Sequence, residues 1–148
     1  MGERSHGFQH EIAATLAKKA ECLTILQRYD EALDCCEKSL PVALHNSNKL
    51  ESGRVYAILA EIHASKGFQD YDKAEAYFEQ ALKAFHDAGA ESDIGRAYLA
   101  GARVAIARND VDSAKQRATK AKRILTKHGR RFYLKQIEEL IGNNRDVI

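Results

Sequence analysis

Apolar side chains recur every three or four residues along almost the whole chain, which is the spacing of one face of an α-helix. In the first stretch Ile12, Leu16, Ala20 and Leu23 follow this spacing and predict a helix over residues 8–27. The next apolar stripe extends from Ala32 to Ala43. The same pattern then predicts five more helices, over residues 49–66, 71–87, 93–108, 111–128 and 131–141.

The residue types near the predicted helix ends agree with these boundaries. Asp30 is expected to cap the second helix by accepting a hydrogen bond from its free amides, and Gly67 and Gly129 stand where helices are expected to end. Pro41 lies inside the second stripe, where it lacks an amide hydrogen and crowds the preceding turn, so a kink or an early helix end is expected there. Residues 1–7 and 143–148 are expected to be flexible, which leaves one helical domain over residues 8–142.

One short pattern occurs three times at nearly constant spacing, at residues 29–32 (YDEA), 71–74 (YDKA) and 111–114 (VDSA). From Ala32 to Ala74 is 42 residues and from Ala74 to Ala114 is 40, a period typical of stacked helical hairpins. The sequence therefore predicts an all-α fold, a right-handed α-solenoid of three antiparallel helix pairs plus a C-terminal capping helix. Alanine is expected where the two helices of a pair cross, because only a small side chain permits a close approach.

Composition agrees with a helical domain and limits the functional classes. The 148 residues are 45% hydrophobic and 30% charged, with a single proline, and their number suits one domain. No apolar run approaches the roughly 20 residues that cross a bilayer, and the first residues lack the apolar core of a signal peptide, so we expect a cytoplasmic protein without membrane contact. Three cysteines make no disulfide framework, and Cys22 and Cys36 are expected to be small core residues.

The net charge of +2 hides an uneven distribution. Residues 1–110 hold 13 Lys and Arg against 17 Asp and Glu, whereas residues 111–148 hold 10 against 4. The basic patch of the last helices consists of Lys120, Arg123, Lys127, Arg130 and Arg131. It is a candidate surface for nucleic acid or an acidic protein, with Phe132 and Tyr133 nearby for stacking. No nucleic-acid motif accompanies the patch, which favours a solvated outer helix.

The paired helices carry a family resemblance, best developed in the second repeat. There the first helix has a bulky residue, a leucine and a small residue at set places, and the second helix has an alanine, an aromatic and another alanine. These are Tyr56, Leu59, Ala60, Ala74, Phe78 and Ala81. The first and third copies depart from this pattern at the aromatic of the second helix. Over residues 9–141 the chain resembles the tetratricopeptide repeat family, in a form with repeats of 40–42 residues. The resemblance implies a noncatalytic adaptor or scaffold that holds a peptide or helix of a protein partner in its concave face.

The resemblance also implies which residues line that concave groove. They lie on the first helix of each pair, as Lys18, Glu21, Arg54, Ala57, Glu61, Arg96, Leu99 and Arg103, beside Ala17. The arginines are expected to anchor acidic groups of a partner, and Ala57 and Leu99 to accept apolar side chains. Glu21 and Glu61 stand where chaperone-binding members of the family have asparagine, which argues against that type of ligand. The alternative is that these positions form ordinary solvated helix faces.

Catalytic and metal-binding motifs do not occur in the sequence. Histidine and cysteine have no metal-ligand spacing, and no phosphate-binding loop or nucleophile motif is present, so we expect no metal, no cofactor and no enzyme activity. A hydrolase built from Glu61 and His63 would need a perturbed carboxylate in a closed cavity. The sequence also leaves open a homodimer through a terminal helix, because apolar residues occur at both ends of the chain. They are Phe8, Ile12, Leu134, Ile137, Leu140 and Ile141.

Overall fold

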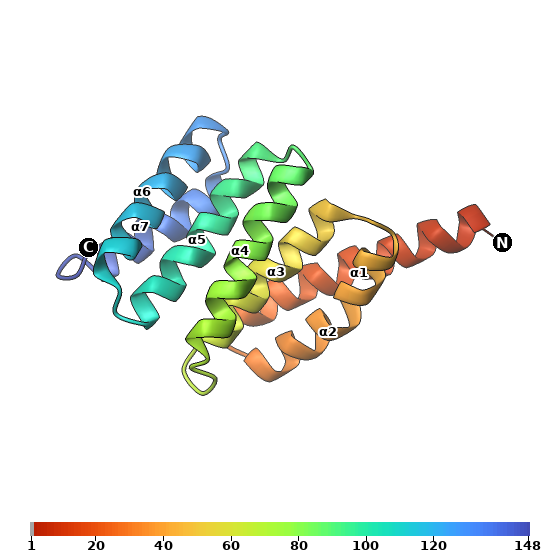
Figure 1. Ribbon diagram of the computed structural model, residues 1–148, viewed down its shortest axis with the longest axis horizontal. Coiled ribbons are helices and arrows are strands. Elements are labelled where there is room, and N and C mark those ends of the chain that lie inside the picture. The colour runs from red at the N-terminus through yellow and green to blue at the C-terminus, as the bar shows by residue number, and fades with distance from the viewer. Residues whose placement is uncertain (1) are drawn as a thin grey trace.

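The computed structural model describes the backbone of residues 2–148 and the side chains of residues 8–148. Within these residues the chain forms seven helices and no strand, so the predicted all-α fold is confirmed (Figure 1). The helices are α1 (Gly2–Ile25), α2 (Tyr29–His45), α3 (Lys49–Ala64), α4 (Tyr71–Asp87), α5 (Glu91–Ala107), α6 (Val111–Lys127) and α7 (Arg131–Asn143). The expected flexible segment 1–7 falls on residues whose side chains lie outside this description. The helical backbone already begins at Gly2, earlier than the expected start at residue 8.

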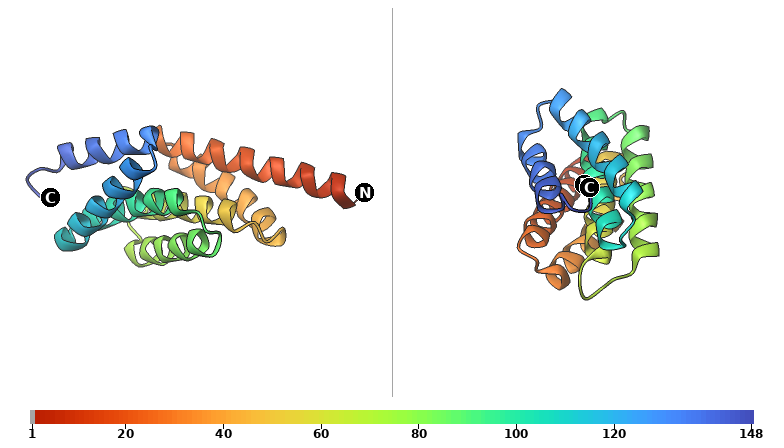
Figure 2. Two further views of the ribbon diagram at one scale, coloured as in Figure 1. Left: turned by 90° about the horizontal axis from the view of Figure 1, so that it is seen from above. Right: turned by 90° about the vertical axis from the view of Figure 1, so that its left-hand side faces the viewer.

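Successive helices pack as the pairs α1–α2, α3–α4 and α5–α6, and α7 packs on α6 and α5. The pairs lie side by side in a curved stack, the helical-repeat solenoid expected from the period (Figure 1). The first helices of the pairs, together with α7, form the inner layer, and α2, α4 and α6 form the outer layer. Figure 2 shows that α1 and α7 lie on the same side of α3 and α5, where the end of α1 approaches the start of α7. The concave side lined by α1, α3, α5 and α7 is called the inner trough, and the residues that line its hollows include Glu61, Arg96 and Tyr133.

Small residues permit the close packing between helices. Ala32, Ala74 and Ala114 are all fully buried, as predicted from their place in the repeat. Glycine serves the same purpose on the neighbouring helices. A methyl group added at Gly101 of α5 would overlap the ring of Phe78, and one added at Gly53 of α3 would lie 2.7 Å from a ring carbon of Phe85. The two aromatic rings of α4 therefore fill spaces that the adjacent helices leave open.

Side-chain caps begin α4 and α6, but no side-chain cap begins α2. Asp70 accepts a hydrogen bond from the amide of Lys73, and Asp110 accepts one from the amide of Ser113. The corresponding residue before α2 is Arg28, which makes no such bond. The expected cap at Asp30 is therefore wrong, because the N-cap position falls on Arg28, two residues earlier, and Asp30 lies inside the first turn of α2.

Two other local expectations concern α2 and the cysteines. The helix α2 continues through Pro41 and ends at His45, so it does not stop at the proline, and the kink that was expected as the other option stays a prediction. Cys22 is exposed, whereas Cys35 and Cys36 are buried, and all three thiols are free. Burial, with smaller contributions from Cys35 and Glu37, raises the pKa of the Cys36 thiol to about 12. Cys36 is thus the core residue that was expected, and Cys22 is not.

The apolar residues near the C-terminus face inward. Ile137 is fully buried, and Leu134, Leu140 and Ile141 pack around the same cluster, which includes Leu99 and Leu125. This packing covers them in part, and a dimer through these residues stays a prediction. At the other end Phe8, in the first part of α1, remains 66% exposed. The N-terminal end of α1 projects beyond the stack (Figure 2). None of the helices within residues 2–148 is both long and apolar enough to cross a bilayer.

Candidate functional site

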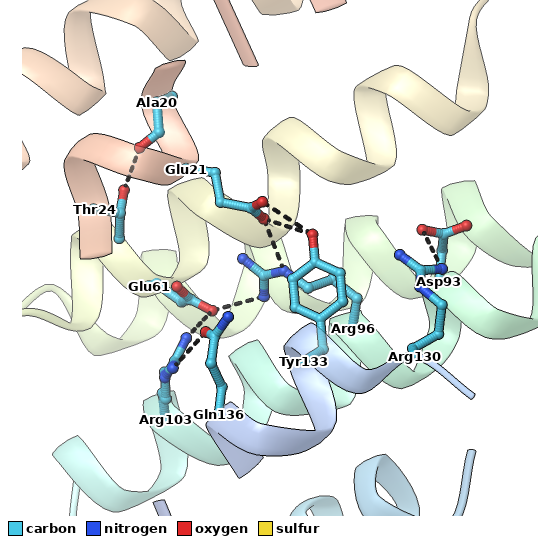
Figure 3. Close-up of polar contacts among 10 residues, drawn as sticks. All are labelled: Ala20, Glu21, Thr24, Glu61, Asp93, Arg96, Arg103, Arg130, Tyr133 and Gln136. Atoms are coloured by element: carbon cyan, nitrogen blue, oxygen red, sulfur yellow. Dashed lines mark hydrogen bonds and ion pairs between the residues drawn. The ribbon is translucent and has the colours of Figure 1, made fainter. Parts of the chain in front are cut away.

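A network of charged side chains occupies the centre of the inner trough (Figure 3). Arg96 of α5 donates from Nη1 to Oε1 of Glu61 on α3 at 2.7 Å, and from Nε to Oε2 of Glu21 on α1 at 3.3 Å. The side chain of Arg96 is only 5% exposed and that of Glu61 only 7%. Three helices thus contribute to one buried cluster of opposite charges.

The network extends along α5 by one further arginine. Arg103 donates from Nη1 to Oε1 of Glu61 at 3.0 Å and from Nη2 to Oε1 of Gln136 on α7 at 2.9 Å. Because a guanidinium only donates, this bond orients the Gln136 amide with its nitrogen away from Arg103. That nitrogen, Nε2, is enclosed and has no hydrogen-bond partner among the described residues.

Tyr133 of α7 closes the network across the trough. Its hydroxyl donates to the Glu21 carboxylate, with oxygen separations of 2.9 and 3.0 Å, and this contact is named here the Glu21–Tyr133 bridge. The guanidinium carbons of Arg96 and Arg130 lie 5.3 and 5.2 Å from the centre of the Tyr133 ring, within the range of cation–π attraction. Arg130 also pairs with Asp93 at 3.5 Å. The bridge joins the first and the last helix.

The charges of the network hold each other in their ionised forms. Burial acts to raise the pKa of Glu61, but the charges of Arg96 and Arg103 and their hydrogen bonds outweigh burial and keep the pKa below its usual value. Burial acts to lower the pKa of Arg96, but Glu61 and Glu21 raise it above its usual value. Burial raises the pKa of Tyr133, so its hydroxyl stays protonated and able to donate. The network carries two acids and two arginines and is neutral as a unit.

Two hollows remain beside the network. The larger pocket, of about 620 Å³, lies where the ends of α1, α3 and α5 meet α7, and it is lined among others by Ile25, Tyr29, Glu61, Lys66, Arg103, Phe132, Lys135, Gln136 and Glu139. The smaller pocket, of about 250 Å³, is lined among others by Ala17, Lys18, Glu21, Arg54, Asp93, Arg96, Arg130 and Tyr133. The two share no lining residue, and the Glu21–Tyr133 bridge borders the smaller one.

The predicted groove residues therefore fall into three groups. Lys18, Glu21, Arg54 and Arg96 line the smaller pocket, and Glu61 and Arg103 line the larger one. Ala57 and Leu99 are fully buried in the core, so they cannot receive apolar side chains of a partner. The prediction that Ala57 and Leu99 line the groove is therefore wrong. Both are buried because α3 and α5 are packed against other helices on several sides.

The three groove arginines already have acidic partners within the chain. Arg96 is enclosed by Glu61 and Glu21, which excludes it as a surface anchor in this conformation. Arg54 is half exposed and lies 3.5 Å from Glu51. Arg103 is partly exposed but pairs with Glu61. The trough consequently offers less free positive charge than the count of its arginines indicates.

The predicted basic patch is divided by the fold. Lys120, Arg123, Lys127 and Arg131 are exposed, whereas Arg130 turns toward the trough and pairs with Asp93. Tyr133 and Phe132 also face the trough and its larger pocket, so they do not accompany the α6 lysines as stacking residues. The basic patch is thus a surface of α6 and the start of α7, and Phe132 and Tyr133 are not part of it.

Sequence reasoning missed four residues of the trough. Tyr133 and Gln136 come from α7, and Ile25 and Phe132 are exposed apolar residues, 51% and 58% exposed, at the larger pocket. The spacing of Tyr133, Gln136 and Ile137 on one helical face was the available signal. It indicates a packed face but not that Tyr133 on this face reaches Glu21 of α1.

The candidate metal-binding and catalytic residues of the site make other contacts among the described side chains. No group of three or more His, Cys, Asp or Glu residues within residues 8–148 is placed to hold a metal ion. Glu61 is held ionised by two arginines, the opposite of a carboxyl group poised to give up a proton. His63 stacks on Tyr77 with ring centres 5.4 Å apart and belongs to the packing of α3 and α4.

These features define an all-α helical-repeat solenoid whose inner trough is crossed by a neutral ionic network. The family model of the tetratricopeptide repeat matches residues 11–87, just over half of the chain, so the chain belongs to the tetratricopeptide repeat family. Repeats of this family generally mediate protein–protein interaction and are generally noncatalytic. No curated protein and no solved structure matches the chain.

Proposed function

We propose that the protein is a noncatalytic adaptor that binds a short segment of a partner protein in the larger pocket of its inner trough. The observation that carries this proposal is the pocket of about 620 Å³ with the exposed apolar side chains Ile25 and Phe132 beside it. Apolar side chains around a concave site with a few polar groups are typical of sites that anchor a ligand side chain.

The charges of the pocket support a partner segment with an acidic group next to an apolar one. Lys66 and Lys135 are exposed and lie in the lining with Glu139, while Glu61 and Arg103 neutralise each other. The two ammonium groups therefore exceed the one unpaired carboxylate. Lys66 and Lys135 replace the buried Arg96 as the proposed contacts for an acidic ligand.

The cellular setting of this proposal is the cytoplasm. Three free cysteines, two of them buried next to each other, suit a reducing compartment. An adaptor role agrees with the structure in two ways. The buried charges pair with each other within the chain, and the larger pocket remains open for a partner.

The proposal is tested by selecting binders from a random peptide library and measuring their affinity by fluorescence anisotropy. Ile25→Asp and Phe132→Asp should each weaken binding about tenfold or more, since each removes roughly 1.5–3 kcal/mol of apolar contact. Leu44→Asp is the matched control, because Leu44 is 52% exposed and lies on α2, outside the pocket. If all three variants bind the selected peptides as tightly as the parent protein, and their helical circular dichroism is unchanged, the pocket is not the binding site.

The acidic preference is tested separately. Lys135→Glu should weaken the binding of acidic peptides, whereas Arg145→Glu, a reversal at an exposed position outside the pocket, should leave it unchanged. If only the apolar variants have an effect, the pocket binds a partner but the acidic specificity is wrong.

A further inference from the structure

The two ends of the outer layer carry opposite charge. The first outer helix, α2, has four acidic residues against one lysine, a net charge of −3. The last outer helix, α6, has six Lys and Arg against Asp112, a net charge of +5. The two helices lie at opposite ends of the stack, with α4 between them (Figure 1). Each helix is 17 residues long, about 25 Å at 1.5 Å per residue.

The cations at the α6 end are available to a partner. Lys122, Arg123 and Lys127 are exposed, and none of them lies within 4.0 Å of a carboxylate among the side chains of residues 8–148. Arg117 is the exception on this helix, since it pairs with Glu75 at 2.8 Å. The three free cations line a shallow hollow of about 490 Å³ with Ile141 of α7. The α6 end thus combines positive charge with a hollow that has an apolar part.

The acids at the α2 end form a complementary surface. Asp30, Asp34 and Glu37 are spaced by four and three residues, lie on one stripe of the helix and are exposed. Asp30, Glu31 and Asp34 line a hollow of about 330 Å³ together with Leu23, Cys35 and one cation, Lys19. Asp34 pairs with Lys38 at 3.0 Å, but both side chains are about 60% exposed, and such surface pairs exchange partners at little cost.

We propose that copies of this chain associate head to tail, with the α2 face of one copy against the α6 face of the next. The evidence for a second copy as the partner is charge complementarity: helices of equal length and opposite charge stand at the two ends of one molecule. Such a contact is heterologous and leaves one α2 face and one α6 face free, so it adds copies in a row or closes into a ring. This proposal does not depend on the occupant of the larger pocket.

A nucleic acid is the competing partner for the α6 face. Binding of single strands commonly uses aromatic side chains for stacking, and Phe132 and Tyr133 face the trough instead. Phosphate contacts alone would also leave the acidic α2 face without a role. The experiment therefore includes a nucleic acid as a probe.

The first measurement is the mass of the full chain by sedimentation velocity and light scattering, over a micromolar to submillimolar series. At about 20 mM salt the average mass should rise above the 16.5 kDa of one chain with increasing concentration. At about 500 mM salt, where the screening length falls to about 4 Å, it should return to that of one chain. A single-chain mass under all conditions overturns the proposal.

Charge reversal at the two ends gives the sharper test. One variant combines Lys122→Glu, Arg123→Glu and Lys127→Glu, and the other combines Asp30→Lys, Asp34→Lys and Glu37→Lys. Each variant alone should stay a monomer at low salt, and an equimolar mixture of the two should associate again. Glu79→Lys, at an exposed site on α4, is the control that should associate as the parent does.

Two results would contradict the head-to-tail contact. The first is a mixture of the two reversed variants that stays monomeric, because complementary charge would then not be the cause. The second is a parent chain that stays monomeric but binds a fluorescent DNA duplex through the three α6 cations. That result would assign the α6 face to nucleic acid.

Discussion

Replacement of Glu61 by glutamine tests the buried ionic network most directly. The glutamine side chain has the same shape but no charge, so the change removes one charge from a site where Arg96 is 5% exposed. Removal of one partner of a buried ion pair typically costs about 3–5 kcal/mol, because the other charge stays buried without compensation. Glu21 at 3.3 Å still serves Arg96, and the glutamine oxygen can accept one hydrogen bond. We therefore expect a loss near the lower limit, about 3 kcal/mol.

The assay is urea unfolding followed by circular dichroism, with thermal unfolding as a second probe. For a chain of this size about 1 kcal/mol corresponds to about 2–4 °C, so Glu61→Gln should lower Tm by about 6–12 °C. Two matched variants calibrate the effect of burial. Glu75→Gln weakens a partly buried pair with Arg117 and should cost about 1 kcal/mol. Glu31→Gln weakens an exposed pair with Arg28 and should cost less than about 0.5 kcal/mol.

The stability losses should decrease in the order Glu61→Gln, Glu75→Gln, Glu31→Gln, and this order tests whether burial sets the cost of losing an ion pair. A Glu61→Gln variant as stable as Glu31→Gln would refute the reasoning, since it would mean that Arg96 finds water or another partner without cost. The variant Arg96→Met supplies the complementary check. Combined with Glu61→Gln it should cost less than the sum of the two single changes, by about 1–3 kcal/mol of coupling.

Three further predictions concern packing, the bridge and pH. Ala74→Leu should destabilise the protein by about 1–3 kcal/mol in urea unfolding, because Ala74 is fully buried, and an unchanged curve would contradict its place in the core. Tyr133→Phe removes the hydroxyl that bonds Glu21 and should cost about 1–2 kcal/mol, with faster amide exchange in α7 than in α4 by mass spectrometry. Burial and the charge of Lys73 lower the pKa of His63 below 6.5. The unfolded chain therefore binds this proton at higher pH than the folded chain, and stability should fall as pH falls through and below 6.5, less steeply in His63→Phe.

The sequence by itself determined the elements and their repeat. Helix boundaries depend on local spacing and on nearby turn residues, and the fourth helix has the expected bounds, Tyr71–Asp87. The alanines at Ala32, Ala74 and Ala114 are buried as expected, because each occupies the same place in a repeated unit. A periodic pattern of this kind carries the information for a stack of helix pairs, since each pair contacts only its neighbours.

The tertiary structure alone decided which polar residues meet. Glu21 and Tyr133 are 112 positions apart and Glu21 and Arg96 are 75 apart, so no local pattern links them. Their contact depends on the curvature of the stack, which brings the start of α7 close to the end of α1 (Figure 2). Helix α3, the first of the middle pair, shows the same limit, because it packs on α1, α2, α4 and α5 and most of its residues are buried. Its apolar pattern therefore cannot tell Ala57 in the core from a position in the trough, because burial on several sides removes the contrast on which the pattern depends.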